Sequence, residues 1–250
     1  MHNAHLGNVA INFNIMRNFN KHFCKISIIL ILLLSANMTA QNPANNNNPY
    51  DYAGRIHNEI LNEVLMEYDT SEINVDNICN IVESKTKKNK ELIDLQATDV
   101  NCDLLQDGVD DYTKQFVNVI NSSQLSEDGK MKAKEVVNYM FEKAFSDVEI
   151  SYSDLYNHYI DLERQIMNNT RLNDFDKKSL LEGCSIARYS AYFWKNTNLN
   201  KSRKSDKPQR GFWGWLAIGA ADVGGGLLGG ISTGISASSL AHTLTDRDKK

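Results

Sequence analysis

The stretch from Tyr50 to Lys207 contains no proline, although it is 158 residues long, and it holds only four glycines. Proline ends or kinks a helix because it lacks the amide hydrogen and its ring clashes with the preceding turn. Alternating patterns typical of strands are nearly absent from this stretch. A long run with few helix breakers and few strand patterns predicts an all-α fold.

Apolar residues in this stretch recur three and four positions apart, which is the spacing of one buried helix face. Six such stripes begin at Ile56, Val75, Tyr112, Val136, Leu155 and Leu180. Ser71 is a candidate cap before the second stripe, and Ser151 with Asp154 stand in capping-box order before the fifth. Gly183, inside the sixth stripe, either permits a close helix crossing or is simply tolerated. We therefore predict a bundle of about six helices, followed by a glycine-rich C-terminal helix or helical hairpin.

Residues 1–40 carry the pattern of an export signal that begins at Met16. Three basic residues between positions 17 and 25 precede the apolar run 26–34, and small or polar residues lead to Ala40. We predict cleavage after Ala40. The alternative is an uncleaved membrane anchor, for which the apolar run is short. Either way the protein is exported, and the cleaved form lies in the periplasm, in the cell envelope or outside the cell.

The charges that follow the predicted signal are unevenly distributed. Residues 41–194 carry 15 basic and 27 acidic side chains, a balance of −12, whereas residues 195–210 carry six basic and one acidic, a balance of +5. An acidic body argues against nucleic acid as a partner. The basic flank of the C-terminal segment consists of Lys201, Arg203, Lys204, Lys207 and Arg210.

Three cysteines follow the predicted signal, at positions 79, 102 and 184. In an exported protein Cys79 and Cys102 are the pair that would close the shortest disulfide loop, which leaves Cys184 unpaired. The alternative is that all three are buried thiols, which are common in helical cores.

Candidates for catalysis, metal binding or cofactor binding are few in this sequence. His57 has Leu61 at the i, i+4 position, which binds no metal, and His158 lies between Tyr156 and Tyr159, so we interpret both as satisfied or exposed histidines. Asp99, Asn101 and Asp103 resemble the opening of a calcium loop, but position six of that loop is leucine rather than the required glycine. The glycines at 224–230 have no lysine after them and no strand pattern before them, so we reject a phosphate loop there. We therefore predict no catalytic residue, metal, cofactor or small-molecule ligand, and the sequence gives no positive reason to assign an enzyme.

The segment 211–241 differs in composition from the rest of the chain. It contains nine of the 14 glycines and one charged residue, Asp222. On a helix it would present a small-residue ridge beside an aliphatic ridge, formed by Gly226, Gly230 and Gly234 and by Val223, Leu227, Ile231 and Ile235. Each glycine in a water-exposed helix costs about 1 kcal/mol, so this helix needs a partner in order to form.

Two partners for this segment are consistent with the sequence. The cations of residues 195–210 precede Trp213 and Trp215 and then the apolar run, which is the layering of a membrane interface. Asp222 opposes simple spanning, because a charge at mid-helix costs roughly 2.5 to 3.5 kcal/mol on insertion. The alternative is that the segment packs on the acidic body as a buried helix or hairpin.

Residues 219–234, GAADVGGGLLGGISTG, resemble the glycine-zipper segments of membrane-active peptides such as bacteriocins and of envelope proteins. This resemblance, which extends over residues 211–241, implies association with a membrane or self-association, and it carries over no catalytic residue. The helical body resembles no characterised family.

These features divide the chain into a signal peptide (1–40), a polar linker (41–49), an acidic helical domain (50–194), a basic linker (195–210), the glycine-rich segment (211–241) and a charged tail (242–250). We expect an exported helical protein whose glycine-rich segment associates with a membrane surface or with a second copy of the chain. The alternative is a soluble binding or scaffold module in which this segment is packed internally.

Overall fold

The computed structural model describes residues 42–67, 74–95, 99–100, 102, 112–144, 150–202, 226, 230–237 and 239–241. The chain divides into two units, residues 1–42 and 43–250, and nearly all described residues belong to the second. Predictions that concern the signal peptide, Trp213, Trp215, Val223, Leu227 and most of the basic flank lie outside the described residues.

The all-α prediction is confirmed, since the described residues form helices joined by turns and contain no strand. Each of the six predicted stripes lies on one helix. The helices are α2 (Tyr52–Glu67), α3 (Val75–Thr86), the short α4 (Lys90–Asp94), α6 (Tyr112–Ser122), α7 (Glu127–Ala144), α8 (Tyr152–Asn168) and α9 (Asp174–Ser202). Only α4, which is five residues long, has no counterpart among the predicted stripes.

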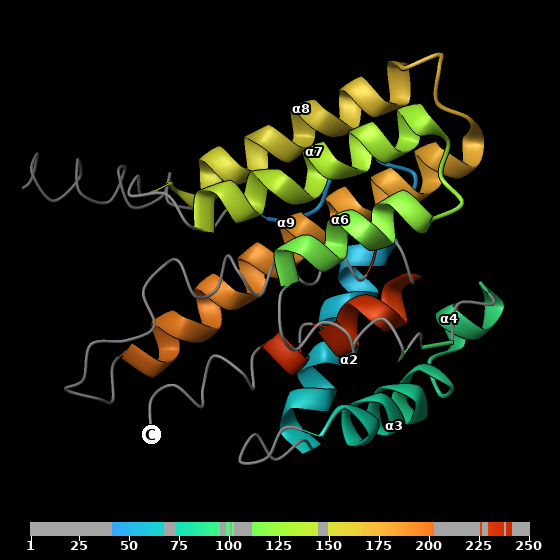
Figure 1. Cartoon of the computed structure of the whole chain (residues 1–250). Coiled ribbons are helices and arrows are strands. Elements are labelled where there is room, and N and C mark those ends of the chain that lie inside the picture. Colours follow the sequence, from blue (N-terminus) through green and yellow to red (C-terminus); the bar gives the residue numbers. More distant parts are fainter. Residues whose placement is uncertain are drawn as a thin grey trace, which may run out of the picture. The chain divides into compact units, whose positions relative to one another are not determined.

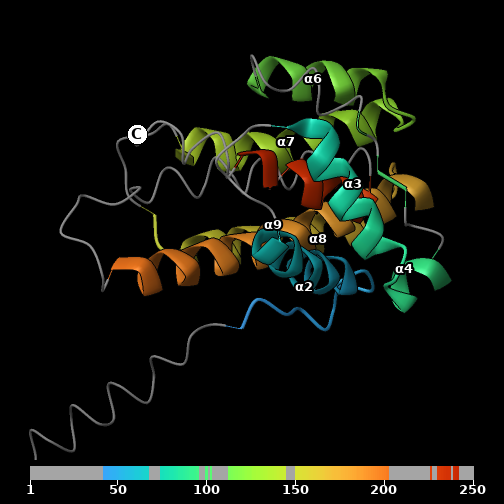
Figure 2. The same cartoon turned by 90° about the horizontal axis from the view of Figure 1, so that it is seen from below.

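Helix α9 is the central element of the body. It packs against α2, α7 and α8, and Figures 1 and 2 show α8 running beside it while α2 lies on another side. Its buried side chains face all three neighbours, so even small and polar residues of α9, such as Cys184, Ser185 and Ser190, are fully buried or nearly so. One long helix therefore organises the core.

Polar side chains fix where several helices begin. Ser151 and Asp154 form the predicted capping box at the start of α8. Helix α3 is capped by Asn74 rather than by the predicted Ser71, because the Asn74 side chain accepts a hydrogen bond from the amide of Asn77 at 2.8 Å. The buried carboxylate of Asp176, at the start of α9, accepts hydrogen bonds from the Ser126 amide and hydroxyl just before α7. This contact joins the starts of α7 and α9.

The closest approach between α2 and α9 is made at Gly54. A Cβ atom placed on Gly54 would lie 2.6 Å from the carbonyl oxygen of Ser185 and 2.5 Å from the Tyr189 ring. The Gly54 amide also donates to the Ser185 hydroxyl at 3.1 Å. Gly183 is buried within α9 as well, but the crossing with α2 depends on the glycine of α2 and the serine of α9.

The C-terminal helix is described at residues 230–237 and 239–241, and all of these except the half-buried Gly230 are buried. Its apolar residues Ile231, Ile235 and Leu240 belong to the same core cluster as residues of α2 and α9. Figures 1 and 2 both place it, in red, beside α2. Packing on the body, which the sequence left as an alternative, is therefore the arrangement found for this helix.

The glycines of the predicted ridge occupy different environments. Gly226 faces the Ile186 side chain of α9 so closely that an added Cβ would collide with its δ-methyl group. Gly230 has a φ of +77° and no neighbour within 4 Å of an added Cβ. Gly234 lies within the buried helix. At Gly230 the glycine thus serves backbone conformation rather than a close helix contact, contrary to the predicted ridge.

The structure pairs Cys79 with Cys102, one of the two alternatives that the sequence allowed, with their Cα atoms 6.2 Å apart. This disulfide ties α3 to the segment beyond α4. Cys184 is a buried free thiol in α9, and burial raises its pKa well above the usual value. A thiol held protonated in this way is a poor nucleophile.

Gly54→Ala tests the crossing between α2 and α9. Alanine is favoured over glycine in a helix by about 1 kcal/mol, so an uncrowded site would gain stability. Here the added methyl meets a backbone carbonyl that cannot rotate away, and we expect a net loss of about 1 to 3 kcal/mol. Urea denaturation measures the change, and a stabilised variant would contradict the crossing.

Candidate functional site

Helices α8 and α9 each place one charged side chain in the core. Glu163 of α8 and Arg188 of α9 are both fully buried. The Arg188 Nη2 atom lies 2.9 Å from Glu163 Oε1, and Nε lies 3.2 Å from the same oxygen. Burying one of these charges alone would be costly, so the two helices are tied by the need to pair them.

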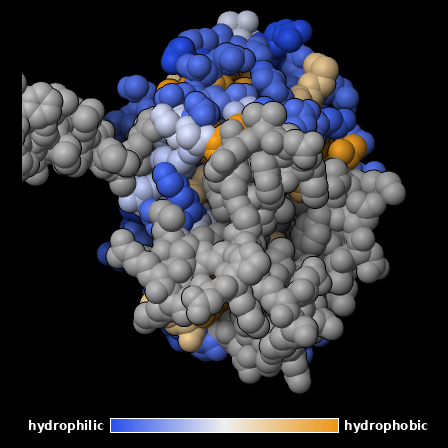
Figure 3. Space-filling view, turned by 90° about the vertical axis from the view of Figure 1, so that its left-hand side faces the viewer, coloured by the Kyte–Doolittle hydropathy of each residue, from blue (hydrophilic) through white to orange (hydrophobic). Residues whose placement is uncertain are grey.

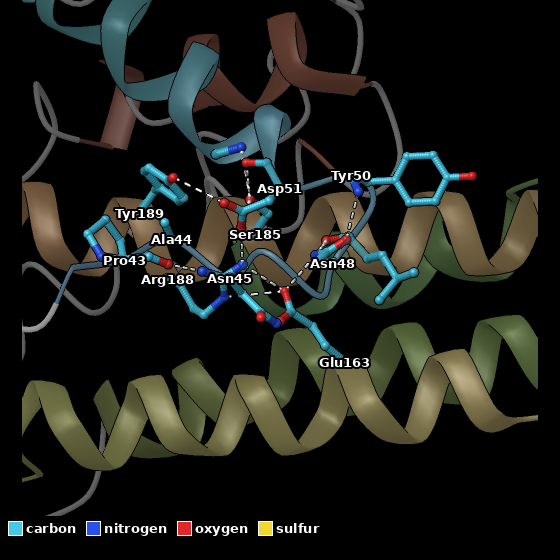
Figure 4. Close-up of polar contacts among 12 residues, drawn as sticks. Pro43, Ala44, Asn45, Asn48, Tyr50, Asp51, Glu163, Ser185, Arg188 and Tyr189 are labelled. Atoms are coloured by element: carbon cyan, nitrogen blue, oxygen red, sulfur yellow. Dashed lines mark hydrogen bonds and ion pairs between the residues drawn. The ribbon is translucent and has the colours of Figure 1, made fainter.

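Residues 43–51, which we call the N-terminal strap, complete this ion pair (Figure 4). The Asn45 amide donates to Glu163 Oε2 at 2.6 Å, and the Asn48 amide donates to Oε1 at 2.7 Å. Arg188 donates to the carbonyl oxygen of Pro43. The sequence predicted a polar linker at residues 41–49, but Pro43, Asn45 and Asn48 are buried. They are buried because they form hydrogen bonds with the two buried charged groups.

The two strap asparagines use both ends of their side chains. The Asn45 side-chain oxygen accepts from the Asn47 amide at 3.1 Å, and that of Asn48 accepts from the Tyr50 amide at 2.8 Å. These contacts fold the strap into turns, a common role of asparagine. The NH₂ groups are then directed at Glu163, while Asn48 also donates to the Leu181 carbonyl at 2.9 Å.

The end of the strap joins the cluster to the start of α2. Asp51 accepts hydrogen bonds from Arg188 and, at 3.2 Å, from the Tyr189 hydroxyl. Its carbonyl oxygen accepts from the Ser185 hydroxyl at 2.9 Å. One guanidinium thus holds α8, the strap and the entry into α2 together.

Electrostatics in this cluster follow from burial and pairing. Burial raises the pKa of Glu163, and Arg188 with the Asn45 and Asn48 amides partly offsets the rise. Burial alone would lower the pKa of Arg188, but Glu163 and Asp51 raise it above its usual value. Every charged group here is engaged by another part of the chain, so the cluster acts as a clamp rather than as a reactive site.

The sequence contained a signal for this clamp that motif reasoning missed. Arg188 stands four residues after Cys184 and three before Ala191, on the apolar face of its stripe. Glu163 likewise follows Tyr159 by four residues and precedes Ile166 by three. A single charge on each of two apolar faces indicates a buried pair. The role of the asparagines, more than 100 residues away, leaves no such pattern.

The remaining candidates from the sequence are not brought together. His57 is buried in α2, with Nδ1 3.0 Å from the Asn58 side-chain oxygen. Asp99 is exposed, while Asn101 and Asp103 lie outside the described residues. Within the described ranges no group of three or more His, Cys, Asp or Glu side chains is placed to hold a metal.

His158 connects α8 to α7 by stacking on Tyr139, with ring centroids 3.4 Å apart. Its Nε2 atom is buried and has no hydrogen-bond partner among the described residues. Burial lowers the pKa of His158, Lys143 lowers it further, and Glu135 and Asp161 partly restore it. Burial at this contact therefore favours the neutral form of the His158 ring over the protonated form.

Comparison of the chain with protein-family models, with curated proteins and with solved structures gives no match. In the part of the chain that the structure describes, no helix combines the length and apolar character needed to cross a bilayer.

Arg188→Met tests the clamp. It leaves the Glu163 carboxylate buried without its cation, and we expect a loss of about 3 to 5 kcal/mol in the free energy of unfolding. Adding Glu163→Gln removes the stranded charge, so the double variant should lose less than the sum of the two single losses. Arg164→Met, which breaks an exposed ion pair with Asp161, is the matched control and should cost no more than about 1 kcal/mol. Equal losses from Arg188→Met and Arg164→Met would contradict a buried clamp.

The His158 contact predicts a pH dependence of stability. In the unfolded chain the pKa of histidine is about 6.5, and in the fold it is lower, so the unfolded chain binds more protons between the two values. This contribution to stability is present above pH ~6.5 and is lost as the pH falls through the folded pKa. Denaturation at a series of pH values should show a steeper decline for the wild type than for His158→Gln. Parallel curves would rule out this role.

Proposed function

We propose that this protein is an exported helical binding or scaffold module whose glycine-rich C-terminal helix completes the core. The observation that carries the proposal is the all-round burial of residues 231–237 and 239–241. A helix whose every face is covered by its own chain has no free surface for a membrane or a second copy. Its glycines, serines and alanines suit close packing among helices.

Export is supported by the position of the first docked residues. The strap begins at Pro43, three residues after Ala40, where the sequence predicts cleavage. Contacts with the helical body therefore begin close to the start of the predicted mature protein. The disulfide between Cys79 and Cys102 also suits an oxidising compartment.

The described surface has the character of a protein that faces water. On the face in Figure 3 it is mainly hydrophilic, with isolated hydrophobic spots. The exposed large apolar side chains are Met66, Ile93, Leu95, Met131 and Phe175, and among them only Ile93 and Leu95 lie on the same element, at the end of α4. Scattered residues of this kind are normal on soluble domains.

Membrane association or self-association through residues 211–241 remains the second proposal, because one observation favours it. The hydroxyls of Ser236 and Ser239 donate to carbonyl oxygens of their own helix, at 3.2 and 2.9 Å. A helix that satisfies its hydroxyls internally can enter an apolar environment without losing those bonds. Residues 230–241 also carry no charged side chain.

Ile235→Ala separates the two proposals. Ile235 is fully buried, so if its helix completes the core the variant should lose about 2 to 5 kcal/mol of stability. Ile93→Ala, at a position 49% exposed, is the matched control and should lose much less. Denaturation without lipid gives both values. Similar small losses would mean that the C-terminal helix contributes little to the fold.

Vesicle flotation tests the membrane proposal directly. The full chain without its signal peptide, and the same chain ending at Arg210, are mixed with anionic vesicles at low salt. We expect the full chain to stay in the soluble fraction. Flotation of the full chain but not of the shortened chain would reverse the order of the two proposals.

A further inference from the structure

The contacts of the strap fall into two groups, those made by Asp51 and those made by residues 43–48. Asp51 belongs to the entry of α2 and is held by Arg188, Ser185 and Tyr189. Residues 43–48 instead meet groups that α8 and α9 present toward them. We call these groups the strap site: the Glu163 carboxylate, the Arg188 Nη1 atom, the Tyr156 hydroxyl and the Leu181 carbonyl.

The strap site contacts both the backbone and the side chains of residues 43–48, as a peptide-binding site does. Arg188 and Tyr156 donate to the carbonyl oxygens of Pro43 and Ala44, the second at 3.1 Å, and so fix the backbone. The Glu163 carboxylate accepts from Asn45 and Asn48, and so fixes the side chains. The intervening residues 46 and 47 are exposed. The sequence pattern that the strap site recognises is Pro-x-Asn-x-x-Asn.

The strap site does not depend on the strap for its own charge balance. Glu163 and Arg188 are bonded to each other from α8 and α9, so departure of residues 43–48 leaves a paired carboxylate and guanidinium that water can reach. Removing a peptide from such a site costs hydrogen bonds but strands no single charge. Pro49 is exposed and Tyr50 half-buried, which places the point of departure between the strap site and the entry of α2.

We propose that the strap site is a peptide-recognition site that can take residues 43–48 of a second copy of this chain in place of its own. The proposal rests on the assignment of the protein as a binding or scaffold module and names the site and the partner. The partner is chosen because its segment has the chemistry that the site already recognises. Exchange of straps joins two copies, each of which supplies asparagines to the Glu163 carboxylate of the other.

In the wild type the strap competes with any peptide from outside. A tethered segment has an effective concentration in the millimolar range, so an added peptide at micromolar concentration finds the site occupied. The exchange becomes measurable when the chain's own strap is weakened. Asn45→Ala with Asn48→Ala does this and leaves the strap site itself unchanged.

The first experiment measures binding of a fluorescein-labelled peptide with the sequence of residues 42–51 by anisotropy. The full-length double variant Asn45→Ala, Asn48→Ala should bind it at least about tenfold more tightly than the wild type does. A peptide with alanine at positions 45 and 48 should bind about tenfold more weakly or worse, since two hydrogen bonds to a buried carboxylate are lost. A peptide with alanine at the exposed positions 46 and 47 is the matched control and should bind like the original.

The second experiment tests the second copy by complementation. Asn45→Ala, Asn48→Ala has an intact site and a weak strap, whereas Glu163→Gln has an intact strap and a damaged site. Each alone should be monomeric by light scattering, and an equimolar mixture should give a 1:1 complex. Absence of peptide binding, equal loss from both alanine peptides, or peptide binding without a mixed complex each overturns the proposal.

Hydrogen exchange of the wild type keeps the test valid if the double variant does not fold. Strap amides that exchange much faster than those of α9 support independent release, and exchange of both at one common rate overturns it. These outcomes concern residues 43–51 and α8. They leave the stability result at Ile235 untouched, so failure of this inference and failure of the proposed function are distinguishable.

Discussion

The fold depends on the charge of Arg188 in the middle of α9, the longest of the helices that the structure describes. A guanidinium cannot lose its proton, so once α9 packs with this side chain inward, acceptors must come to it. Glu163 of α8, the carbonyl of Pro43 and the carboxylate of Asp51 provide them. This single requirement draws α8, the first docked residues of the chain and the entry of α2 to one place. An apolar side chain at position 188 would impose no such convergence.

Close packing around α9 then follows from small residues. Gly54 lets α2 approach the backbone of Ser185, and Gly226 lets the C-terminal segment approach Ile186. The serine hydroxyl completes the approach by bonding to both the Gly54 amide and the Asp51 carbonyl. The clamp and the crossing are therefore neighbours on α9, separated by one helical turn. Charge pairing selects the partners, and glycine sets how closely they lie.

The candidate site was harder to predict than the helices around it. Helices leave a local record, because a buried face repeats every three or four residues. The Glu163–Arg188 pair left a weaker one, a lone charge on each of two apolar faces. The contribution of Asn45 and Asn48 left none, since their run of asparagines reads as a solvated linker and their partner lies 118 and 115 residues away. For the same reason the sequence left open what the glycine-rich segment packs against, because the need for a partner does not identify that partner.

The helical class, the six long helices and the capping box at Ser151 can be predicted from the amino-acid sequence, because they depend on residues within a few positions of one another. The sequence also limited the disulfide to two alternatives. Three features follow from the three-dimensional arrangement alone: the strap is buried, Gly54 rather than Gly183 makes the close crossing, and residues 230–241 pack on the body. These features depend on which distant surfaces pack together. The free energy of such a contact belongs to both residues, so the local spacing around one of them does not reveal it.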